Sequence, residues 1–280
     1  MNAAARLPWL PTRQWADLKT TDFARLPAHS VAVLPVATTE QHGPHLPLSV
    51  DADLADAIVA ACQPHLPDEL PALFLPTLRY GLSPEHAAFA GTLTLRPETC
   101  LQLWGDIAAS VKASGVQRLV IFNTHGGHVG LMDVAGRDLR ARLGMMVWGV
   151  SWFNLPLHDA QGQDLMAAFG AAEARFGVHA GAVETAMMLA CRPAQVDMSQ
   201  ARDFASASQA RAAQFEILGN GRSAKLAWQM QDYNPQGAAG NAAAADAARG
   251  QALIAAAGRA LAQLLQEIDR LPPETLRPAP

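Results

Sequence analysis

Two short apolar runs, each followed at once by a polar loop, constrain the fold of this chain most strongly. The runs are VAVLPV at Val31–Val36 and LVIF at Leu119–Phe122. Neither run alternates apolar with polar residues, and this pattern is typical of strands buried on both faces of a parallel sheet. The loops after them are TTEQHGPHLPLS and NTHGGH. We therefore expect buried parallel strands that lead into polar loops.

Segments with helical spacing of apolar residues alternate with these strands. We expect helices over 51–62, 96–114, 129–143, 180–191 and 242–269, and further strands over 73–78 and 145–150. Ser49 or Asp51 is expected to cap the first helix, and residues 201–245 are expected to form helix plus loop. The alternation predicts an α/β protein, with helices on both faces of a parallel sheet. No linker or repeat divides the chain, so we expect one domain over residues 1–280.

The composition excludes several classes of protein. Half of the 280 residues are hydrophobic (50%), 16% are charged and the formal net charge is −4, so neither disorder nor nucleic-acid binding is expected. Cys62, Cys100 and Cys191 lie far apart, which indicates core residues in a reducing compartment rather than a disulfide framework. The N-terminal stretch lacks the apolar region of a secretion signal, and no run approaches about 18 apolar residues. We expect a cytoplasmic protein that binds neither nucleic acid nor membrane.

Metal-capable side chains gather in three clusters. In chain order these are Glu40, Gln41, His42, His45 and Asp51; residues 123–128 (NTHGGH); and residues 179–184 (HAGAVE). The first two clusters follow predicted strands, and in open α/β sheets ligands bind at the carboxyl ends of the strands. If the first loop is extended, its period of two points Glu40 and His42 to the same side.

Each cluster alone has an ordinary structural explanation. A Glu-x-His pair is more often a surface pair than a metal site, and a carboxylate at a helix start is most often a cap or dipole partner. The coincidence of three clusters favours a metal site. Glu40, Asp51 and Glu184 together carry three negative charges. Two divalent ions with a bridging hydroxide neutralise them, whereas one ion leaves a net negative charge. Such mixed ligands suit Zn²⁺, Mn²⁺ or Fe²⁺ better than Ca²⁺ or Mg²⁺.

Four segments together resemble the creatininase (creatinine amidohydrolase) family of metal-dependent amidohydrolases. They are LPVATTEQHGPHLPLSVD (34–51), RYGLSPEHAAFAGTLTL (79–95), IFNTHGGH (121–128) and HAGAVETAMML (179–189), within a similarity that spans about residues 30–260. The resemblance implies a three-layer α/β/α sandwich with a mostly parallel sheet. It also implies a binuclear centre of Zn²⁺ or Mn²⁺, with Fe²⁺ as a further candidate, and a homo-oligomer, in this family a hexamer.

The same resemblance implies a set of metal ligands. The five residues are Glu40, His42, Asp51, His125 and Glu184. Asp51 would bridge the two ions. Glu40 and His125 would be the further ligands of one ion, and His42 would be a ligand of the other. Creatininase itself has a Glu two residues after the ligand histidine, where this chain has Gly127. The last carboxylate is therefore expected from Glu184.

Other residues take their expected roles from the resemblance. His179 would hand a proton to the departing nitrogen, although a hydrogen bond at the helix entry would also explain it. The substrate would lie near Glu85, His86 and Trp152, and for Trp152 core packing is an equal alternative. His128 stands where Asn is commoner in the family, and would be a substitute ligand or a substrate contact.

The predicted reaction is hydrolysis of a carbon–nitrogen amide bond, linear or cyclic, in a small polar molecule. A metal-bridging hydroxide would attack the carbonyl, and His179 would protonate the leaving nitrogen. Gly127 makes creatinine itself doubtful as the substrate. Two alternatives stay open: deformylation of a pyrimidine nucleotide intermediate, and trimming of a peptide-derived redox-cofactor precursor. A phosphorylated substrate would need a nearby cation such as Arg79, although Arg79 is better explained as a surface residue.

The rival from another class is a non-catalytic metal-binding or assembly protein. A structural metal site is closed, whereas a catalytic site keeps one coordination position open. Gly126, Gly127 and Gly181 are expected to leave room for a substrate, which favours the enzyme. The Ala-rich segment 241–258 is expected either to form contacts between subunits or to pack within the fold.

Overall fold

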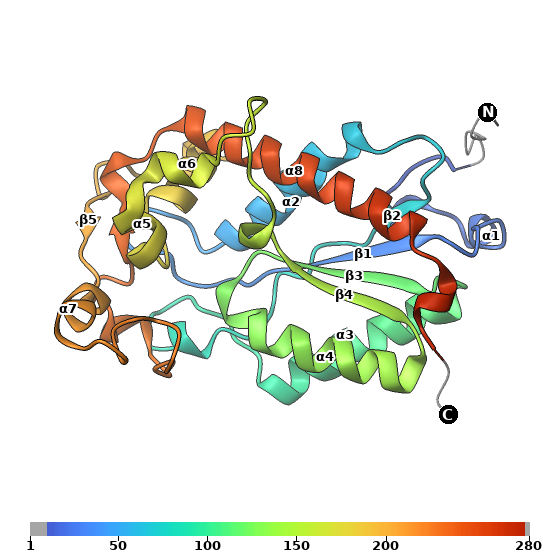
Figure 1. The fold of residues 1–280 in the computed structure, drawn as a ribbon, viewed down its shortest axis with the longest axis horizontal. Helices are drawn as coiled ribbons and strands as arrows, with labels where there is room; N and C mark the ends of the chain where they lie inside the picture. The colour runs from blue at the N-terminus through green and yellow to red at the C-terminus, as the bar shows by residue number, and fades with distance from the viewer. Residues whose placement is uncertain (1–9, 278–280) are drawn as a thin grey trace.

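A four-stranded parallel sheet forms the centre of the computed structural model, which describes residues 10–277 (Figure 1). In spatial order the strands are β2 (Ala72–Phe74), β1 (Val31–Val36), β3 (Arg118–Asn123) and β4 (Met146–Ser151). Every residue of β1 and β3 is buried, because these inner strands are covered on both faces. The prediction drawn from the two apolar runs is confirmed.

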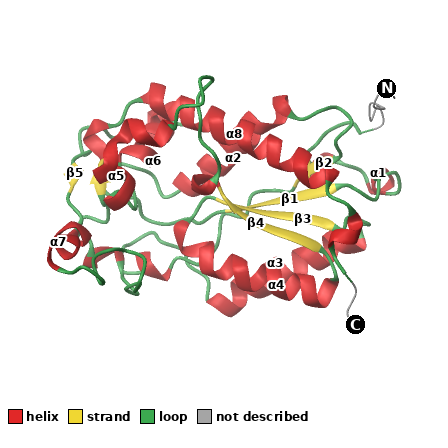
Figure 2. Ribbon diagram, viewed as in Figure 1, coloured by secondary structure: helices red, strands yellow, loops and turns green. Residues whose placement is uncertain are grey.

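Helices cover both faces of this sheet and make a three-layer α/β/α sandwich (Figure 2). One side carries α2 (Val50–Cys62), α6 (Ala182–Cys191) and α8 (Ala247–Arg270), and the other side carries α3 (Pro97–Ala113) and α4 (Val129–Leu143). Successive side chains of a strand point to opposite faces. Val31 and Val33 therefore pack into the first of these two cores, and Ala32 and Leu34 pack into the second. The predicted fold class is confirmed.

Smaller elements lie beyond one end of the sheet. They are α5 (Gly170–Phe176), α7 (Ala207–Gln214) and the antiparallel pair of β5 (Asp203–Phe204) and β6 (Gly240–Asn241). The short α1 (Thr20–Phe23) lies at the opposite end of the molecule (Figure 1). Two 3-10 helices contribute to the site described below, η3 (Pro84–His86) and η4 (Gly126–His128).

Two predicted boundaries were wrong for identifiable reasons. β2 ends at Phe74 rather than at residue 78, because Pro76 has no N–H to donate to a strand ladder. α8 begins at Ala247 rather than at residue 242, because Asp246 is its N-cap. The Asp246 carboxylate accepts the backbone N–H of Arg249 at 2.9 Å.

The start of α2 positions a carboxylate for the site. Ser49 is the N-cap, as one of the two alternatives predicted, but its hydroxyl donates to the Asp53 carboxylate at 2.7 Å instead of accepting a backbone N–H. Asp51 lies inside the first turn and is only 1% exposed. Its carboxylate therefore points into the protein rather than capping the helix.

Among residues 10–277, no helix has the length and apolar character that a membrane span requires. The expectation about a secretion signal rests partly on residues 1–9, which lie outside the described residues.

The strand order creates a position for a ligand at the carboxyl ends of β1 and β3. β1 pairs with β2 on one side and with β3 on the other, so the connections after β1 and β3 leave in opposite directions. Ligands of open α/β sheets bind at such a topological switch point. Residues 37–49 follow β1 and residues 124–128 follow β3, so the first two predicted clusters meet there.

Candidate metal centre

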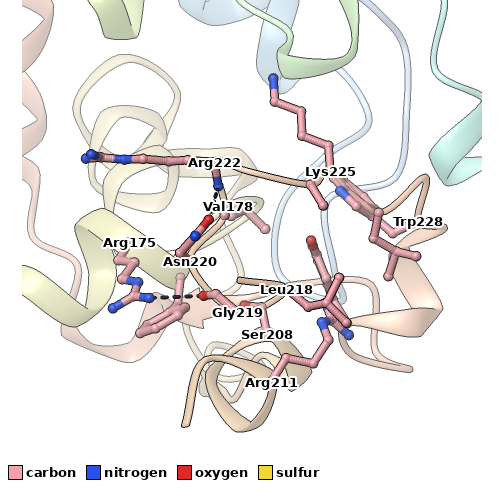
Figure 3. Close-up of a pocket in the computed structure, with 15 residues that line it drawn as sticks. Arg175, Val178, Ser208, Arg211, Leu218, Gly219, Asn220, Arg222, Lys225 and Trp228 are labelled. Atoms are coloured by element: carbon pink, nitrogen blue, oxygen red, sulfur yellow. Dashed lines mark hydrogen bonds between the residues drawn. The ribbon is translucent and has the colours of Figure 1, made fainter. Parts of the chain in front are cut away.

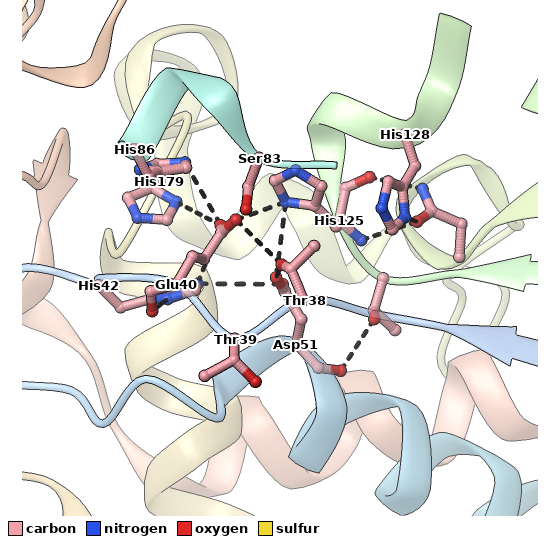
Figure 4. Close-up of polar contacts among 12 residues, drawn as sticks. Thr38, Thr39, Glu40, His42, Asp51, Ser83, His86, His125, His128 and His179 are labelled. Atoms are coloured by element: carbon pink, nitrogen blue, oxygen red, sulfur yellow. Dashed lines mark hydrogen bonds and ion pairs between the residues drawn. The ribbon is translucent and has the colours of Figure 1, made fainter. Parts of the chain in front are cut away.

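The loop after β1 brings two carboxylates together around one hydroxyl (Figure 4). Glu40 lies in this loop and is 0% exposed, and Asp51 reaches it from α2. The Thr38 hydroxyl lies 2.9 Å from Glu40 Oε2 and also contacts Asp51 Oδ2. From the loop after β3, the Thr124 hydroxyl donates to the Asp51 carbonyl at 2.8 Å. These bonds hold the two carboxylates side by side.

His42 presents a nitrogen with a free lone pair to these carboxylates. Its Nδ1 lies 3.1 Å from the carbonyl oxygen of Glu40, which accepts only from a protonated nitrogen, so Nδ1 carries the proton. In the neutral ring Nε2 then has the free lone pair, and it is buried without a hydrogen-bond partner. It lies 3.9 Å from Asp51 Oδ1 and 4.0 Å from Glu40 Oε1. Histidines that bind metals are commonly oriented in this way through their other nitrogen.

His125 has the same arrangement with its nitrogens exchanged. Nε2 donates to the carbonyl of Leu82 at 3.1 Å, so in the neutral ring Nδ1 has the free lone pair. Nδ1 lies 3.2 Å from Glu40 Oε1 and 3.5 Å from Asp51 Oδ2. The two oxygens of Asp51 thus face different histidines, Oδ1 toward His42 and Oδ2 toward His125. A bridging carboxylate requires this arrangement.

The segment that enters α6 supplies two more predicted residues. Glu184 Oε2 accepts the N–H of Ala180 at 2.6 Å, and Ala180 has a φ of 52°, a value that is rare for a residue with a Cβ. Such strained backbone is concentrated at functional sites. His179 donates from Nε2 to the Gln41 carbonyl at 2.7 Å, and its Nδ1 lies 3.9 Å from Glu40 Oε1.

The donor atoms of these residues fall into groups in which all atoms lie within 4.8 Å of one another. The groups are Glu40–Asp51–His125, His42–His179–Glu184 and Glu40–His86–His179. The first two contain all five residues predicted as ligands. They also separate His125 from His42, as two neighbouring ions would require. The structure therefore brings the five residues together, and it adds His179 to the second group.

The 3-10 helix η3 adds His86 to the cluster as a donor. Gln41 Oε1 accepts the Gly43 N–H at 2.9 Å, so the amide nitrogen of Gln41 faces His86 Nδ1 at 2.8 Å. His86 Nδ1 is then an acceptor and Nε2 carries the proton. Nε2 lies 3.3 Å from Glu40 Oε1. In this tautomer His86 has no lone pair to offer a metal, and its Nε2 lies near Glu40 Oε1 without forming a hydrogen bond to it.

The departure from creatininase at Gly127 has a steric explanation. A Cβ at this position would lie 2.1 Å from Glu85 Oε1 and 2.4 Å from His125 Nε2, so both side chains occupy the space that a larger residue would need. Glu85 Oε1 itself lies 3.2 Å from His125 Nε2. At Gly126 a Cβ would meet nothing within 4 Å, whereas at Gly181 it would collide with another carboxylate. Of the three glycines predicted to leave room for a substrate, Gly126 and Gly127 line the pocket above the centre and Gly181 does not.

Buried charges in this cluster change one another's protonation. Burial by itself would lower the pKa of His125, but neighbouring carboxylates, Glu40 foremost, raise it well above its usual value. Burial would also lower the pKa of His42. Asp51 and other carboxylates outweigh this effect, so that the pKa of His42 is raised. Burial raises the pKa of Glu184 to about 7. A divalent cation bound here would therefore displace the protons of His42, His125 and Glu184.

Unpaired buried atoms show independently that the donor set fits metal ions. Glu40 Oε1 and His42 Nε2 are buried without a hydrogen-bond partner. Leaving such an atom unsatisfied costs about 1–3 kcal/mol, which coordination to a cation would offset. Carboxylate and imidazole ligands together suit Zn²⁺, Mn²⁺ and Fe²⁺. The pocket above the centre has a volume of about 520 Å³, within the range of small-molecule sites.

Two predicted substrate contacts lie in the scaffold. His128 is 0% exposed; its Nδ1 donates to Asn123 Oδ1 and its Nε2 accepts the Leu82 N–H, both at 3.0 Å. Because both nitrogens are paired within the protein, His128 has no atom to offer an ion or a substrate, contrary to the prediction. Trp152 is 3% exposed and packs in the core, so the core alternative is the one that the structure supports.

Two residues with positioning contacts were missed in the sequence. Thr38 joins both carboxylates, and it could have been found because it is the first polar residue after β1. Gln41 lies within the first cluster, but nothing in the sequence indicates that its amide sets the tautomer of His86.

The fold and the centre first define a class: an α/β/α sandwich with a carboxylate and histidine centre at the carboxyl ends of its strands. Within that class, the family model described as "Creatininase: Creatinine amidohydrolase" matches residues 16–265, so the chain belongs to the creatininase family.

Two curated relatives have different names. A mycofactocin precursor peptide peptidase of Mycobacterium tuberculosis is 38% identical over 132 residues, which are 45% of this chain and 52% of that protein. A creatinine amidohydrolase of Pseudomonas putida is 30% identical over 192 residues, 64% of this chain and 70% of that protein. This chain thus spans about half the length of the first relative that it matches.

Solved structures of creatininases have the same fold as this chain. A crystal structure of creatininase has a TM-score of 0.71 and 24% identity, covering 94% of this chain and 100% of its own. Another, described as "Creatininase Mn", has a TM-score of 0.69 and 22% identity, covering 91% of this chain and 98% of its own. At these identities the likeness shows the fold.

Proposed function

We propose that this protein is a metal-dependent hydrolase that cleaves a carbon–nitrogen amide bond, linear or cyclic, in a small polar substrate. The observation that carries the proposal is the convergence of two carboxylates and two histidine nitrogens, His42 Nε2 and His125 Nδ1, at the switch point of the sheet. Membership of a family described as creatinine amidohydrolase supports the same reaction class.

The five predicted residues would hold two ions. Glu40 and His125 would bind one, His42 and Glu184 would bind the other, and Asp51 would bridge them, since its oxygens face both histidines. Zn²⁺ and Mn²⁺ are the candidates, with Fe²⁺ as a third, and one related structure is named for Mn. Such ions polarise a carbonyl and lower the pKa of a bound water.

His179 is suited to move the proton of the reaction. Burial, reinforced by His42 and His86, holds the pKa of His179 well below its usual value. The ring is therefore neutral at pH 7, and Nδ1 is its free acceptor because Nε2 donates to the Gln41 carbonyl. A proton taken up at Nδ1 is held weakly, so the protonated ring is a strong acid toward a leaving nitrogen.

A peptide-derived substrate is the second candidate, because the relative with 38% identity is named as a precursor peptide peptidase. Both candidates break an amide bond, so the same centre serves either one. A non-catalytic metal-binding role is less well supported, since His179 and Gly126 line the pocket beside four of the five predicted ligands, Glu40, Asp51, His125 and Glu184. A homo-oligomer, hexameric by the resemblance, and a cytoplasmic location also remain predictions; light scattering with size exclusion tests the first.

The test compares two carboxylates of the same helix. Asp51→Asn should lose metal, measured by mass spectrometry of the metal content, and should lose hydrolysis of a panel of small amides and short peptides. Asp53→Asn is the matched control, because Asp53 interacts with Ser49 and lies outside the groups of candidate ligand atoms. Binding of two ions by Asp51→Asn, or hydrolysis by the wild type that persists after complete metal removal, would refute the proposal.

A further inference from the structure

A buried carboxylate outside the metal centre lies where three segments of the chain meet. Glu173 belongs to α5, is 7% exposed and lies outside the groups of candidate ligand atoms. Its Oε1 accepts the Ala182 N–H at 2.6 Å, and its Oε2 accepts the Asn241 N–H at 2.8 Å. Within residues 10–277 it forms no ion pair with Lys, Arg or His. Backbone N–H groups therefore stabilise this carboxylate, and one of them lies at the positive start of α6.

Three glycines leave the space that this carboxylate occupies. A Cβ at Gly177 or Gly181 would lie 2.4 or 2.2 Å from its Oε1 atom, and a Cβ at Gly240 would lie 2.7 Å from the same atom. These glycines come from the end of α5, the entry to α6 and β6. Gly240 also has a φ of 137°, which favours glycine. Three backbone segments thus pack against one carboxylate at distances that leave no room for a side chain.

Contacts on another side of α5 keep Glu173 in place. Arg175 follows it by two residues and so lies on a different side of the helix. Arg175 donates to the Gly219 carbonyl at 3.1 Å and lines a separate pocket of about 420 Å³ between α5, α7 and the loop of residues 218–228 (Figure 3). α5 is thus attached to this loop through Arg175 and to the entry of α6 through Glu173.

The segment that Glu173 holds carries two residues of the centre. Ala182 is the first residue of α6, Glu184 follows it by two residues, and His179 precedes it by three. Ala180 has the rare φ of 52°, and its N–H donates to Glu184 Oε2 at 2.6 Å. A residue keeps such a conformation only where its surroundings impose it. The hydrogen bond from Ala182 to Glu173 supplies a restraint two residues from the strained position.

The other oxygen of the same carboxylate restrains the backbone beside His179. His179 and Ala239 exchange backbone hydrogen bonds, at 2.8 Å from the Ala239 N–H and at 3.4 Å from the His179 N–H. Asn241, which donates to Glu173 Oε2, lies two residues after Ala239. Glu173 therefore ties together the two backbone segments that meet at His179.

We propose that Glu173 is a positioning residue of the metal centre, an inference that rests on the proposed function. Through its two backbone hydrogen bonds it holds the strained turn at Ala180. This turn places Glu184 and His179 in the second group of donor atoms. The first group comes from α2 and the loops after β1 and β3, so it should keep its geometry without this restraint.

The substitution Glu173→Gln keeps the shape of the side chain but removes one acceptor. The amide has a single oxygen, so it accepts only one of the two N–H groups, and its NH₂ group faces the other. In calorimetric titration, metal-free wild type should bind two Zn²⁺ ions. Loss of a residue that supports a metal ligand weakens metal affinity about 10- to 100-fold. The variant should show this loss for one ion and an unchanged affinity for the other.

The matched control for a general loss of stability is Arg118→Gln. Arg118 is 4% exposed and lies at the start of β3, the end of the strand away from the centre. Its guanidinium donates to the carbonyls of Ile268 and Asp269 at the end of α8, so it also holds a helix end through backbone atoms. The control should lose stability in urea unfolding and keep its affinity for both ions.

Two further variants test the route of the effect. Glycine adopts a positive φ without steric cost, so Ala180→Gly reduces the restraint that the turn needs. Added to Glu173→Gln, it should recover about threefold or more of the lost affinity, since the conformation costs about 1–2 kcal/mol in a residue with a Cβ. Glu173→Asp keeps both oxygens on a shorter side chain and should weaken the same ion by a smaller factor. If Glu173→Gln does not fold, Glu173→Asp takes its place in the comparison.

Each outcome decides the proposal. Selective weakening of one ion, partly restored by Ala180→Gly, supports it. Unchanged affinities, equal weakening of both ions, the same pattern in the control, or no recovery with Ala180→Gly would overturn it. A wild type that binds two ions but hydrolyses no amide contradicts the proposed function alone, whereas a wild type that binds fewer than two ions contradicts both.

Discussion

Replacement of Gly127 by alanine tests the steric explanation for the glycine at this position, where creatininase has a glutamate. The added Cβ would lie 2.1 Å from Glu85 Oε1 and 2.4 Å from His125 Nε2. Glu85 can swing away because the contact involves the end of a flexible side chain. His125 cannot move freely, because its Nε2 donates to the Leu82 carbonyl and its Nδ1 faces the carboxylates. The substitution should therefore tilt the histidine ring that the metal centre needs.

The expected effects of Gly127→Ala are measurable and have a neighbouring control. Forced packing of this kind costs about 1–3 kcal/mol of the free energy of unfolding, and displacing the support of a metal ligand weakens metal affinity about 10- to 100-fold. Gly126→Ala meets no atom within 4 Å and should change stability by no more than about 0.5 kcal/mol. Urea unfolding of metal-free protein and calorimetric titration with Zn²⁺ measure both quantities. Equal stability and equal Zn²⁺ affinity in the two variants would refute the reasoning.

Three further predictions concern buried side chains. Burial, with His42 nearby, lowers the pKa of His45 to about 4, below its unfolded value of about 6.5. The unfolded state therefore binds more protons between these values, and metal-free protein should lose up to about 3 kcal/mol as the pH falls through that window. Between pH 7.5 and pH 5, His45→Gln should lose less free energy of unfolding than the wild type, as measured by urea unfolding. An equal loss in the two proteins would contradict this. His128→Ala should lower the unfolding free energy by about 1–3 kcal/mol, because the Leu82 N–H and Asn123 Oδ1 lose their partner. The number of metal ions bound should stay the same. Loss of an ion would mean that His128 is a ligand. Trp152→Ala should cost about 3–5 kcal/mol as a core truncation, and a loss of activity without a loss of stability would instead place the indole at the substrate.

Much of the sheet could be predicted because its information is local. Val31–Val36 and Leu119–Phe122 are apolar on both faces, and only an inner strand of a covered sheet buries both faces. The α4 range of Val129–Leu143 also agrees with the predicted helix, which Gly144 ends in a left-handed conformation. Boundaries failed where a single residue overrode the pattern, as Pro76 did for β2 and Asp246 did for α8.

The residues of the centre could be named, but their geometry could not. Glu40, His42 and Asp51 follow β1 closely enough to be expected together. Nothing local shows that Asp51 turns one oxygen to His42 and the other to His125. The tautomers likewise depend on backbone carbonyls, such as that of Leu82, which lies 43 residues away from His125.

The sequence alone determined which chemical groups stand at the ends of the buried strands, because strand burial and the residues that follow a strand are properties of short segments. Only the tertiary structure decided which of those groups have free lone pairs, and that the space beside Gly127 is filled by Glu85. The reason is physical: hydrogen-bond partners, steric exclusion and charge density depend on distances in space, and for this chain those distances join residues far apart in the sequence.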